Sequence, residues 1–194
     1  MSPQPTVVLA STSHYRAALL RRLLDHFEQA PPGTDEAPWK DERPAARAAR
    51  LAETKARDVA ARFPGAVIIG SDQVADLDGL ILDKPGTVGA AHEQLKASSG
   101  RDVVFHTAVC VFDLRGDATT HIDETRVRFR ELSREDIERY VERERPLDCA
   151  GSFKCEGLGI ALFERIENED PTALIGLPLI ATSRLLRAAG VVLP

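Results

Sequence analysis

The sequence of 194 residues is poor in aromatic residues and in cysteine. Aromatic residues make up 5% of the chain, and its three cysteines, Cys110, Cys149 and Cys155, have no CxxC spacing. An odd number of cysteines at these spacings indicates neither a disulfide framework nor a zinc site. The five histidines are scattered and form no HExxH pair, so the helical metalloprotease signature is missing too.

The sequence also lacks an apolar run of the roughly 20 residues that a membrane span needs. Its first residues, MSPQPTVVLAS, do not have the basic and then apolar layout of a signal peptide. We therefore expect a cytoplasmic protein with no membrane partner. The net charge of −5 argues against stable, nonspecific nucleic-acid binding. It leaves room for a small anionic ligand at a local basic cluster.

Strand and helix patterns are mixed along the chain. Apolar and β-branched runs predict strands at 6–10, 66–72, 103–113, 121–130 and 160–166, and a hairpin within 74–82. Capped or amphipathic stretches predict helices at 14–25, 45–63, 87–98, 133–144 and 178–189. The stretch PPGTDEAPWKDERP, rich in proline, glycine and charge, predicts a loop. These elements fit one domain, simple or lobed, of α/β or α+β class with mixed strand directions.

The segment LASTSHYR, residues 9–16, predicts a strand, a turn and the start of a helix. Such a turn directs free backbone N–H groups and the positive end of the helix at one place, which favours phosphate. Ser11 and Ser13 add hydroxyl donors, and Arg16 can bind phosphate oxygens with its forked guanidinium. The alternative is that Ser13 only caps the helix and that Arg16 is a solvated surface residue.

Two charged residues stand among apolar neighbours. Lys55 lies in the apolar stripe of the predicted alanine-rich helix. Its side chain either extends to solvent, beside Glu53 or Asp58, or reaches a polar site. Asp72 ends the second predicted strand, where open sheets present ligand residues. This carboxylate can hold magnesium or position an attacking water, or it can be a simple cap.

Together, these residues have the chemistry of a triphosphate site. Lys84, in the motif ILDKP, follows the predicted hairpin and adds a third basic residue to Arg16 and Lys55. Glu36, in the loop sequence TDEAP, offers a second carboxylate for a metal beside Asp72.

The stretch 147–179 carries one further isolated carboxylate. Its apolar sequence is interrupted by four glycines, Gly151, Gly157, Gly159 and Gly176. Glycines in this setting indicate close approach of the backbone. Glu156, in KCEG, is either a turn residue or a hydrogen-bond acceptor that reads a base.

In their order along the chain, these motifs resemble the Maf family of nucleotide pyrophosphatases. The resemblance rests on LASTSHYR, LAETKA, IIGSDQV, ILDKP, SGR, HTAV, AGSFKCEG and LIGLPL, which span nearly the whole chain. It implies one domain over 1–194, with a mixed, elongated sheet flanked by helices and two lobes around a cleft, and usually a homodimer. It also implies hydrolysis of a nucleoside triphosphate between the α and β phosphates, assisted by a divalent cation, Mg²⁺ or Mn²⁺.

The resemblance also implies roles for single residues. Asp72 would accept the proton of the attacking water and, with Glu36, hold the metal. Arg16, Lys55 and Lys84 would neutralise the charge on the phosphates as the bond breaks.

Within the family, the triplet SDQ and the segment AGSFKCEGLGIALFERIE resemble the branch that hydrolyses 7-methyl-GTP. A branch for dTTP and UTP would have threonine after the aspartate and glutamine in place of Glu156. In the 7-methyl-GTP branch Glu156 would accept hydrogen bonds from the guanine edge, and Gln73 would orient the sugar or base. Tyr15 would stack on the positively charged methylated ring. The family's usual S-P-R-R is SHYR here, so His14 replaces proline.

Two alternatives remain at this point. The first is a pyrophosphatase for dTTP and UTP or for non-standard purine triphosphates. The second is a nucleotide-binding regulator of cell division without turnover, for which the set of acidic, basic and metal-binding residues would be superfluous.

Overall fold

The computed structural model describes residues 4–193, so the first three residues of the segment MSPQPTVVLAS lie outside the described part. Within residues 4–193 the chain forms seven strands and five α-helices. The strands are β1 (Val7–Ala10), β2 (Glu28–Gln29), β3 (Val67–Leu77), β4 (Leu80–Ile81), β5 (Asp102–Phe112), β6 (Ala118–Phe129) and β7 (Phe163–Glu167). The α-helices are α1 (His14–Leu20), α2 (Pro44–Ala60), α3 (Val88–Ser98), α4 (Arg134–Glu144) and α5 (Leu179–Ala188). Three short 3₁₀ segments are η1 (Ala150–Ser152), η2 (Leu158–Leu162) and η3 (Ala173–Ile175).

The sheet contains strands of both directions. Its order is β2-β1-β3-β5-β6-β7, with β4 paired to β3. β1 is parallel to β2 and β3, whereas the pairs β3–β4 and β6–β7 are antiparallel. The predicted mixed α/β class is therefore confirmed. The chain divides into two compact units, unit 1 with residues 1–72, 107–123 and 170–194, and unit 2 with residues 73–106 and 124–169.

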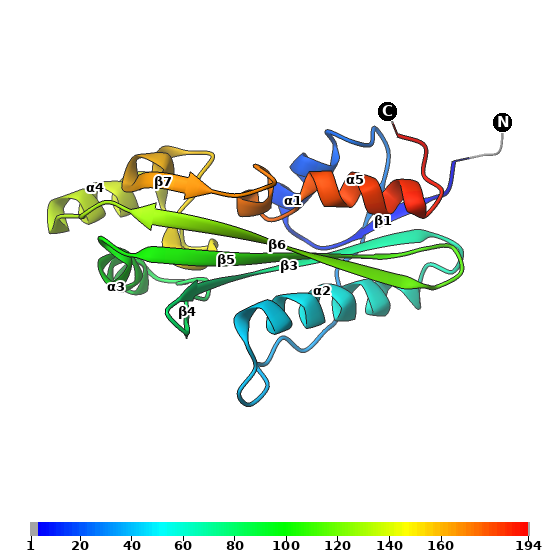
Figure 1. The fold of residues 1–194 in the computed structure, drawn as a ribbon, viewed down its shortest axis with the longest axis horizontal. Helices are drawn as coiled ribbons and strands as arrows, with labels where there is room; N and C mark the ends of the chain where they lie inside the picture. The colour runs from blue at the N-terminus through cyan, green and yellow to red at the C-terminus, as the bar shows by residue number, and fades with distance from the viewer. Residues whose placement is uncertain (1–3, 194) are drawn as a thin grey trace. The chain divides into compact units, whose positions relative to one another are not determined.

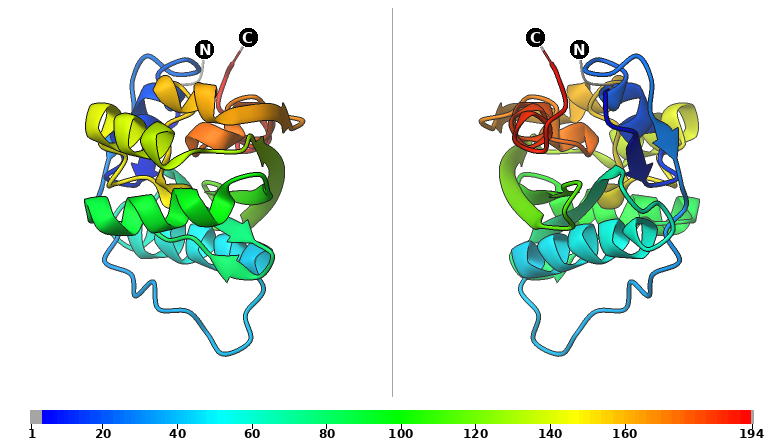
Figure 2. Two further views of the ribbon diagram at one scale, coloured as in Figure 1. Left: turned by 90° about the vertical axis from the view of Figure 1, so that its left-hand side faces the viewer. Right: turned by 90° about the vertical axis from the view of Figure 1, so that its right-hand side faces the viewer.

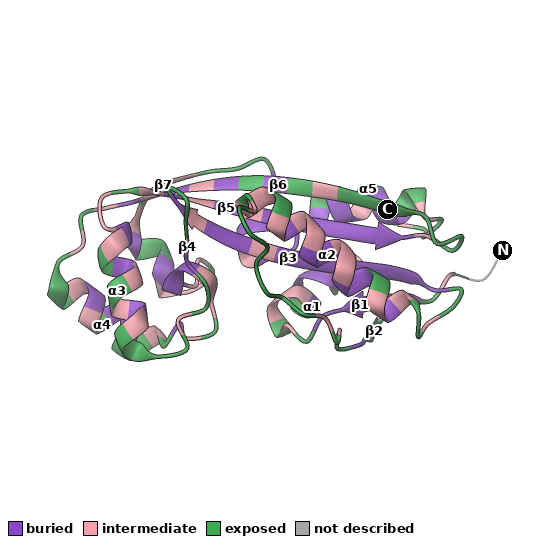
Figure 3. Cartoon of the chain, turned by 90° about the horizontal axis from the view of Figure 1, so that it is seen from below, coloured by how far each residue is buried: buried purple, intermediate pink, exposed green. Residues whose placement is uncertain are grey.

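Unit 1 has helices on both faces of its strands, α2 on one face and α1 with α5 on the other (Figure 1). Successive residues of a strand point to opposite faces. Val7, Leu9, Val67 and Ile69 accordingly join one apolar cluster with residues of α1 and α5. Figure 3 shows β1 buried along its length. Burying each of these side chains contributes about 1.5–3 kcal/mol to the free energy of unfolding. The cluster therefore holds β1 and β3 in place against α1 and α5.

β3 differs from the prediction. It is a single strand of 11 residues, so the prediction that the strand ends at Asp72 was wrong. A charged residue after a buried apolar run is typical of the end of a strand. Here the charge of Asp72 is paired with Lys55, so the strand can continue past it. The hairpin after it is confirmed. Asp78 and Gly79 both have positive φ, 52° and 90°, as a tight two-residue turn requires.

Two other boundaries were also predicted wrongly. α1 ends at Leu20 instead of residue 25, because hydrogen bonds from residue i to i−3, such as Arg22 N–H to the Leu19 carbonyl, replace the α-helical pattern. The last predicted strand begins only at Phe163, since η2 precedes it. No helix within residues 4–193 is long and apolar enough to cross a membrane.

Unit 2 contains α3 and α4, which lie side by side (Figure 2). Its core includes four phenylalanines whose rings meet edge to face, with centroids 4.7–5.6 Å apart. They are Phe105, Phe129, Phe153 and Phe163. Edge-to-face pairs of this kind contribute about 0.5–1.5 kcal/mol beyond their buried area. More than half of the seven phenylalanines of the chain thus stabilise the unit that carries Lys84 and Glu156.

Candidate active site

Lys55 of α2 is the centre of a charged cluster in unit 1. Its Nζ lies 2.6 Å from Oδ1 of Asp72 and 2.8 Å from Oε1 of Glu36, and 7% of its side chain is exposed. The alternative that Lys55 extends to solvent is therefore wrong. Glu53 and Asp58, its expected partners in that case, pair instead with arginines of α2 and the turn after it.

Gly70 allows α2 to approach β3 closely enough for this contact. A Cβ atom at Gly70 would lie 2.1 Å from the Ala52 carbonyl oxygen and 2.8 Å from the Ala56 Cβ. Any larger residue would therefore push the helix away from the strand. Asp72 follows two residues later and so points to the same face of β3, toward α2. Asp72 reaches Lys55 because side chains alternate along β3 and because Gly70 has no side chain to keep α2 away.

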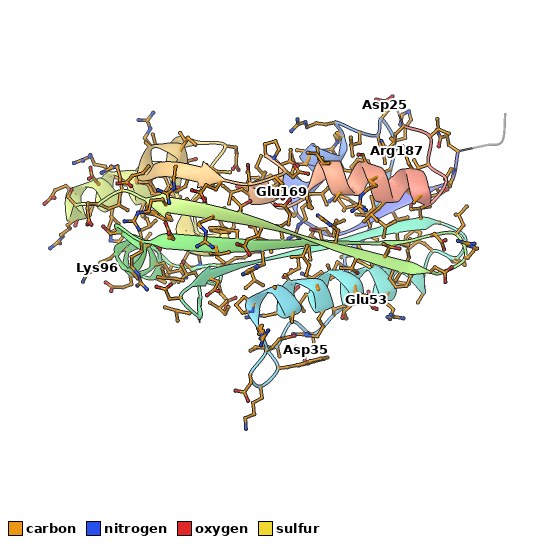
Figure 4. The ribbon with its side chains drawn as sticks, viewed as in Figure 1. Asp25, Asp35, Glu53, Lys96, Glu169 and Arg187 are labelled. Carbon is orange, nitrogen blue, oxygen red and sulfur yellow. The ribbon has the colours of Figure 1, made fainter. Side chains whose placement is uncertain are left out.

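Glu36 reaches the cluster from the loop between β2 and α2. Residues 31–43 contain no helix or strand, as predicted, and Figure 4 shows Asp35, the neighbour of Glu36, in this loop below α2. The Glu36 side chain is 55% exposed, whereas that of Asp72 is 11% exposed. A buried carboxylate and an accessible one thus converge on a single cation.

Arg16 of α1 adds a second positive charge. Its Nε donates a hydrogen bond of 3.0 Å to the Gly176 carbonyl, and Nη1 lies 3.5 Å from Oγ of Ser11. Burial lowers the pKa of Arg16 below its ordinary value, and the negative charges of Asp72 and Glu36 offset part of this effect. Arg16 is therefore not a freely solvated residue, and it lies within electrostatic reach of both carboxylates.

The two serines before α1 bond locally. Oγ of Ser13 accepts the Arg16 N–H, which makes Ser13 the N-cap of α1, and the Ser13 N–H donates to Oγ of Ser11. The capping role of Ser13 is thus confirmed, while phosphate binding by these hydroxyls stays a prediction. The ring of Tyr15 lies against that of His14 with a centroid distance of 3.8 Å. Tyr15 therefore contacts the residue that stands in place of the family's usual proline.

The sequence predicts close approach of the backbone around Gly176, but it does not predict that Arg16 binds there. Gly176 has φ of 124°, a conformation that favours glycine, and its carbonyl also accepts the Ser71 hydroxyl at 3.0 Å. The buried Asp170 carboxylate accepts the N–H groups of Thr172 and Ile180. Asp170 therefore fixes the loop that holds Arg16. An aspartate two residues before threonine, in DPT, is the local signal for such a turn.

Three predicted site residues belong to unit 2. Lys84 is exposed and follows β4, Gln73 is half-buried in β3, and Glu156 is exposed in the turn after η1. Oε2 of Glu156 lies 3.4 Å from Sγ of Cys155. Burial, together with the nearby charge of Glu156, raises the pKa of the Cys155 thiol to about 12.

One side chain of α3 connects the segments that carry Lys84 and Glu156. Gln94 donates from Nε2 to the Asp83 carbonyl at 2.8 Å, and its Oε1 accepts the Ser152 hydroxyl at 2.5 Å. Ser152 is buried and has φ of 61°, an uncommon conformation for a residue other than glycine. No sequence pattern predicts this bridge, because an amide on a half-buried helix face has no distinctive signal.

The turn that contains Glu156 is also held from α4. Lys154 N–H donates to the Tyr140 hydroxyl at 3.0 Å, and the Leu158 N–H donates to the Glu144 carboxylate at 2.9 Å. These bonds lie on either side of Glu156 in the sequence. Its position in unit 2 is consequently fixed by α4 as well as by its own turn.

The carboxylates of Glu36 and Asp72 fit a magnesium or manganese ion as a pair. Carboxylate oxygen is the preferred protein ligand of these hard cations, and Mg²⁺ is commonly bound by one or two carboxylates together with substrate phosphates. Both groups already meet at one cationic nitrogen. Among residues 4–193 there is no group of three or more His, Cys, Asp or Glu side chains placed for a metal. The other ligands would have to be phosphate oxygens and water.

Comparison with known proteins assigns the chain to a family. The family described as Maf-like protein matches residues 6–189. The chain belongs to the Maf family. The resemblance seen in the motifs is therefore confirmed, and the Maf assignment covers both units.

Several curated Maf relatives are similar over nearly their whole length. A protein of Xanthomonas oryzae pv. oryzae named 7-methyl-GTP pyrophosphatase is 56% identical, over 98% of this chain and 100% of that protein. Proteins of the same name are 57% identical in Aromatoleum aromaticum, over 97% of each chain, and 55% identical in Burkholderia pseudomallei, over 96% of this chain and 88% of that one. A solved dITP/XTP pyrophosphatase of Mycobacterium abscessus aligns with 14% identity and a TM-score of 0.45, over 95% of this chain and 94% of that one.

Proposed function

We propose that this Maf protein is a nucleoside triphosphate pyrophosphatase that hydrolyses 7-methyl-GTP to 7-methyl-GMP and pyrophosphate. The observation that carries the proposal is the full-length similarity, at 55–57% identity, to proteins named for this activity. The cluster of Lys55, Asp72, Glu36 and Arg16 supplies acidic and basic groups suited to phosphate chemistry. Such an enzyme would remove a modified nucleotide from the cellular pool.

Asp72 is the proposed proton acceptor. Water attacks the α-phosphorus, its proton passes to the Asp72 carboxylate, and the bond from the α-phosphorus to the bridging oxygen breaks with release of pyrophosphate. Arg16 and Lys55, and Lys84 in unit 2, are proposed to offset the negative charge that grows on the leaving oxygens. A fixed guanidinium such as that of Arg16, bonded to the Gly176 carbonyl, needs little reorganisation during this step.

Glu36 and Asp72 are the proposed ligands of the divalent cation. When bound, the cation polarises phosphoryl oxygens and neutralises charge. Lys55 holds the two carboxylates together, so this chain organises the ligand pair through its own ammonium group. Lys55 would also donate a hydrogen bond to a phosphate oxygen of the substrate.

Base recognition is assigned to Glu156, with Gln73 and Tyr15 as supporting residues. The Glu156 carboxylate accepts hydrogen bonds from the guanine edge and offsets the positive charge of the methylated ring. A hydrogen bond to a charged group is worth roughly 1.5–3 kcal/mol. Stacking of Tyr15 on the cationic ring adds about 0.5–2 kcal/mol. Pyrimidines have neither this charge nor this donor edge.

Pyrophosphate release, measured with and without Mg²⁺ on a panel of nucleotides, tests the proposal. We expect metal-dependent release from 7-methyl-GTP, weaker release from GTP, and poor release from dTTP and UTP. A preference for UTP or a non-standard purine would reject the substrate, and nucleotide binding without any release would favour a regulator of cell division.

The homodimer implied by the family resemblance is also part of the proposal. Its test is independent of activity. Light scattering during gel filtration should give about twice the chain mass of 21.2 kDa, and a monomer mass would reject the dimer.

A further inference from the structure

Arg50 of α2 binds the loop that carries Glu36. Its Nε and Nη2 donate to the two carboxylate oxygens of Glu42 at 2.6 and 2.7 Å, and Nη2 also donates to the Ala37 carbonyl at 3.2 Å. The guanidinium lies 4.3 Å from the ring centroid of Trp39. One side chain thus contacts three residues of the loop, at a carboxylate, a carbonyl and an aromatic face.

The loop is closed around these contacts. The Trp39 N–H donates to Oε2 of Glu42 at 3.2 Å, and the Glu42 N–H donates to the Trp39 carbonyl at 3.3 Å. The side chains of Arg50 and Glu42 are only 13% and 7% exposed. A forked, shielded ion pair of this kind keeps its geometry much better than an exposed pair of flexible side chains.

These contacts lie next to the candidate active site in the sequence and on the same helix. Ala37, whose carbonyl Arg50 binds, directly follows Glu36, and Arg50 is five residues before Lys55 in α2. Glu36 is itself 55% exposed, and its carboxylate pairs with the Lys55 ammonium. The backbone carbonyl next to Glu36 is therefore held to α2 by a side-chain hydrogen bond.

We propose that Arg50 is a positioning residue that clamps the loop of residues 37–42 to α2 and thereby presents Glu36 to the metal beside Asp72. This inference rests on the proposed function, in which Glu36 is a metal ligand. It assigns to Arg50 no contact with substrate. Arginine suits the position and lysine does not, because only a planar guanidinium can bind a carboxylate through two nitrogens and also stack on an indole ring.

Trp39 gives a direct test of the clamp, since it is the only tryptophan of the chain. The steady-state anisotropy of its fluorescence reports how freely the loop moves, without substrate or metal. Arg50→Met removes the positive charge and keeps the aliphatic part of the side chain. Arg50→Lys keeps the positive charge but lacks the planar guanidinium that binds a carboxylate through two nitrogens. Arg57→Met is the matched control, because Arg57 is an arginine of the same helix that pairs with Glu53 and lies over Phe112 at 5.3 Å.

We expect lower Trp39 anisotropy in Arg50→Met, a partial loss in Arg50→Lys and no change in Arg57→Met. Outer partners of metal ligands typically contribute about 10–100-fold to metal affinity or activity. The Mg²⁺ concentration for half-maximal pyrophosphate release should therefore rise about tenfold in Arg50→Met, with turnover largely recovered at high Mg²⁺. A merely structural residue would lower turnover at every Mg²⁺ concentration.

Two results would overturn the proposal. Unchanged anisotropy in a folded Arg50→Met variant would show that the loop does not depend on Arg50. Lower anisotropy with an unchanged Mg²⁺ requirement would show that the clamp does not serve the metal. If the wild-type protein released no pyrophosphate, the proposed function would fail, and the anisotropy would still decide whether the clamp exists.

Discussion

Lys55 and Asp72 form a largely buried ion pair of 2.6 Å that links α2 to β3. Glu36 shares the same ammonium group at 2.8 Å, so one positive charge holds two negative ones. Two carboxylates this close repel each other unless a cation lies between them. The two carboxylates are thus suited to bind a divalent ion. Removing the ammonium group of Lys55 has consequences that can be measured.

Asp72→Asn should stop catalysis while the protein stays folded. The amide has nearly the same shape as the carboxylate but cannot accept the proton of the attacking water. Loss of a general base typically costs about 10²–10⁴-fold in turnover. Pyrophosphate release under saturating 7-methyl-GTP measures this loss, and the melting temperature serves as the control. Near-normal turnover in the variant would reject Asp72 as the base.

Lys55→Met should lower turnover and also make stability depend on Mg²⁺. Methionine fills the same space, but Asp72 is left buried without its cation. Removing one partner of a buried pair costs on the order of 3 kcal/mol. The free energy of unfolding should fall in metal-free buffer and recover in part when Mg²⁺ binds the two carboxylates. If Mg²⁺ stabilises wild type and variant equally, the metal does not bind at this pair.

Lys55 and Asp72 could be recognised separately in the sequence, because each puts a charge where apolar residues predict burial. Their contact could not, since it depends on how closely α2 packs on β3. That approach is possible because Gly70 has no side chain. A glycine before Ser-Asp is not by itself a sign of helix packing, and so the pair was inferred only as part of a charge cluster.

Contacts between segments far apart in the sequence likewise could not be predicted from local sequence patterns. The Gly176 carbonyl binds Arg16 from 160 residues away, and no periodicity encodes that meeting. The strand boundary at Asp72 was wrong for a related reason. A polar residue favours a strand end unless a partner elsewhere in the fold neutralises it, and Lys55 is such a partner.

Gln94→Met should weaken catalysis and base selection together. Methionine has the length of glutamine but cannot bond to Asp83 or Ser152, so the segments of Lys84 and Glu156 lose their common support in unit 2. We expect a decrease in kcat/KM of about tenfold, the equivalent of about 1.4 kcal/mol, and a smaller preference for 7-methyl-GTP over GTP.

Lys96→Met provides the matched control for Gln94, because Lys96 is an exposed residue of the same helix (Figure 4). It should leave both kcat/KM and the preference unchanged. A Gln94→Met variant that loses rate but keeps the full preference for 7-methyl-GTP would show that Gln94 does not support the Glu156 turn.

The thiol of Cys155 should react slowly with alkylating reagents up to high pH. Its pKa is raised to about 12, first by burial and then by the charge of Glu156, so the reactive thiolate is scarce at neutral pH. Glu156→Gln removes the negative charge that helps to raise the pKa of Cys155. The pKa of Cys155 should fall, and its alkylation at pH 9 should become faster, with Cys149 as the internal reference. Mass spectrometry of the labelled peptides measures both rates. Equal Cys155 rates in wild type and variant would contradict the contact between Glu156 and the thiol.

The most direct test of the central proposal is the ratio of kcat/KM values for 7-methyl-GTP, GTP and UTP in the wild-type protein and in Glu156→Gln. GTP has the same hydrogen-bonding edge, so the preference rests on the positive charge of the methylated ring. Attraction between this charge and the Glu156 carboxylate is about 1–4 kcal/mol at a separation of about 4 Å, equivalent to a preference of about 5–700-fold. We predict that the wild-type protein prefers 7-methyl-GTP to GTP within this range, uses UTP poorly, and loses most of the preference in Glu156→Gln. A wild-type protein that hydrolyses UTP better than 7-methyl-GTP would contradict the proposed substrate.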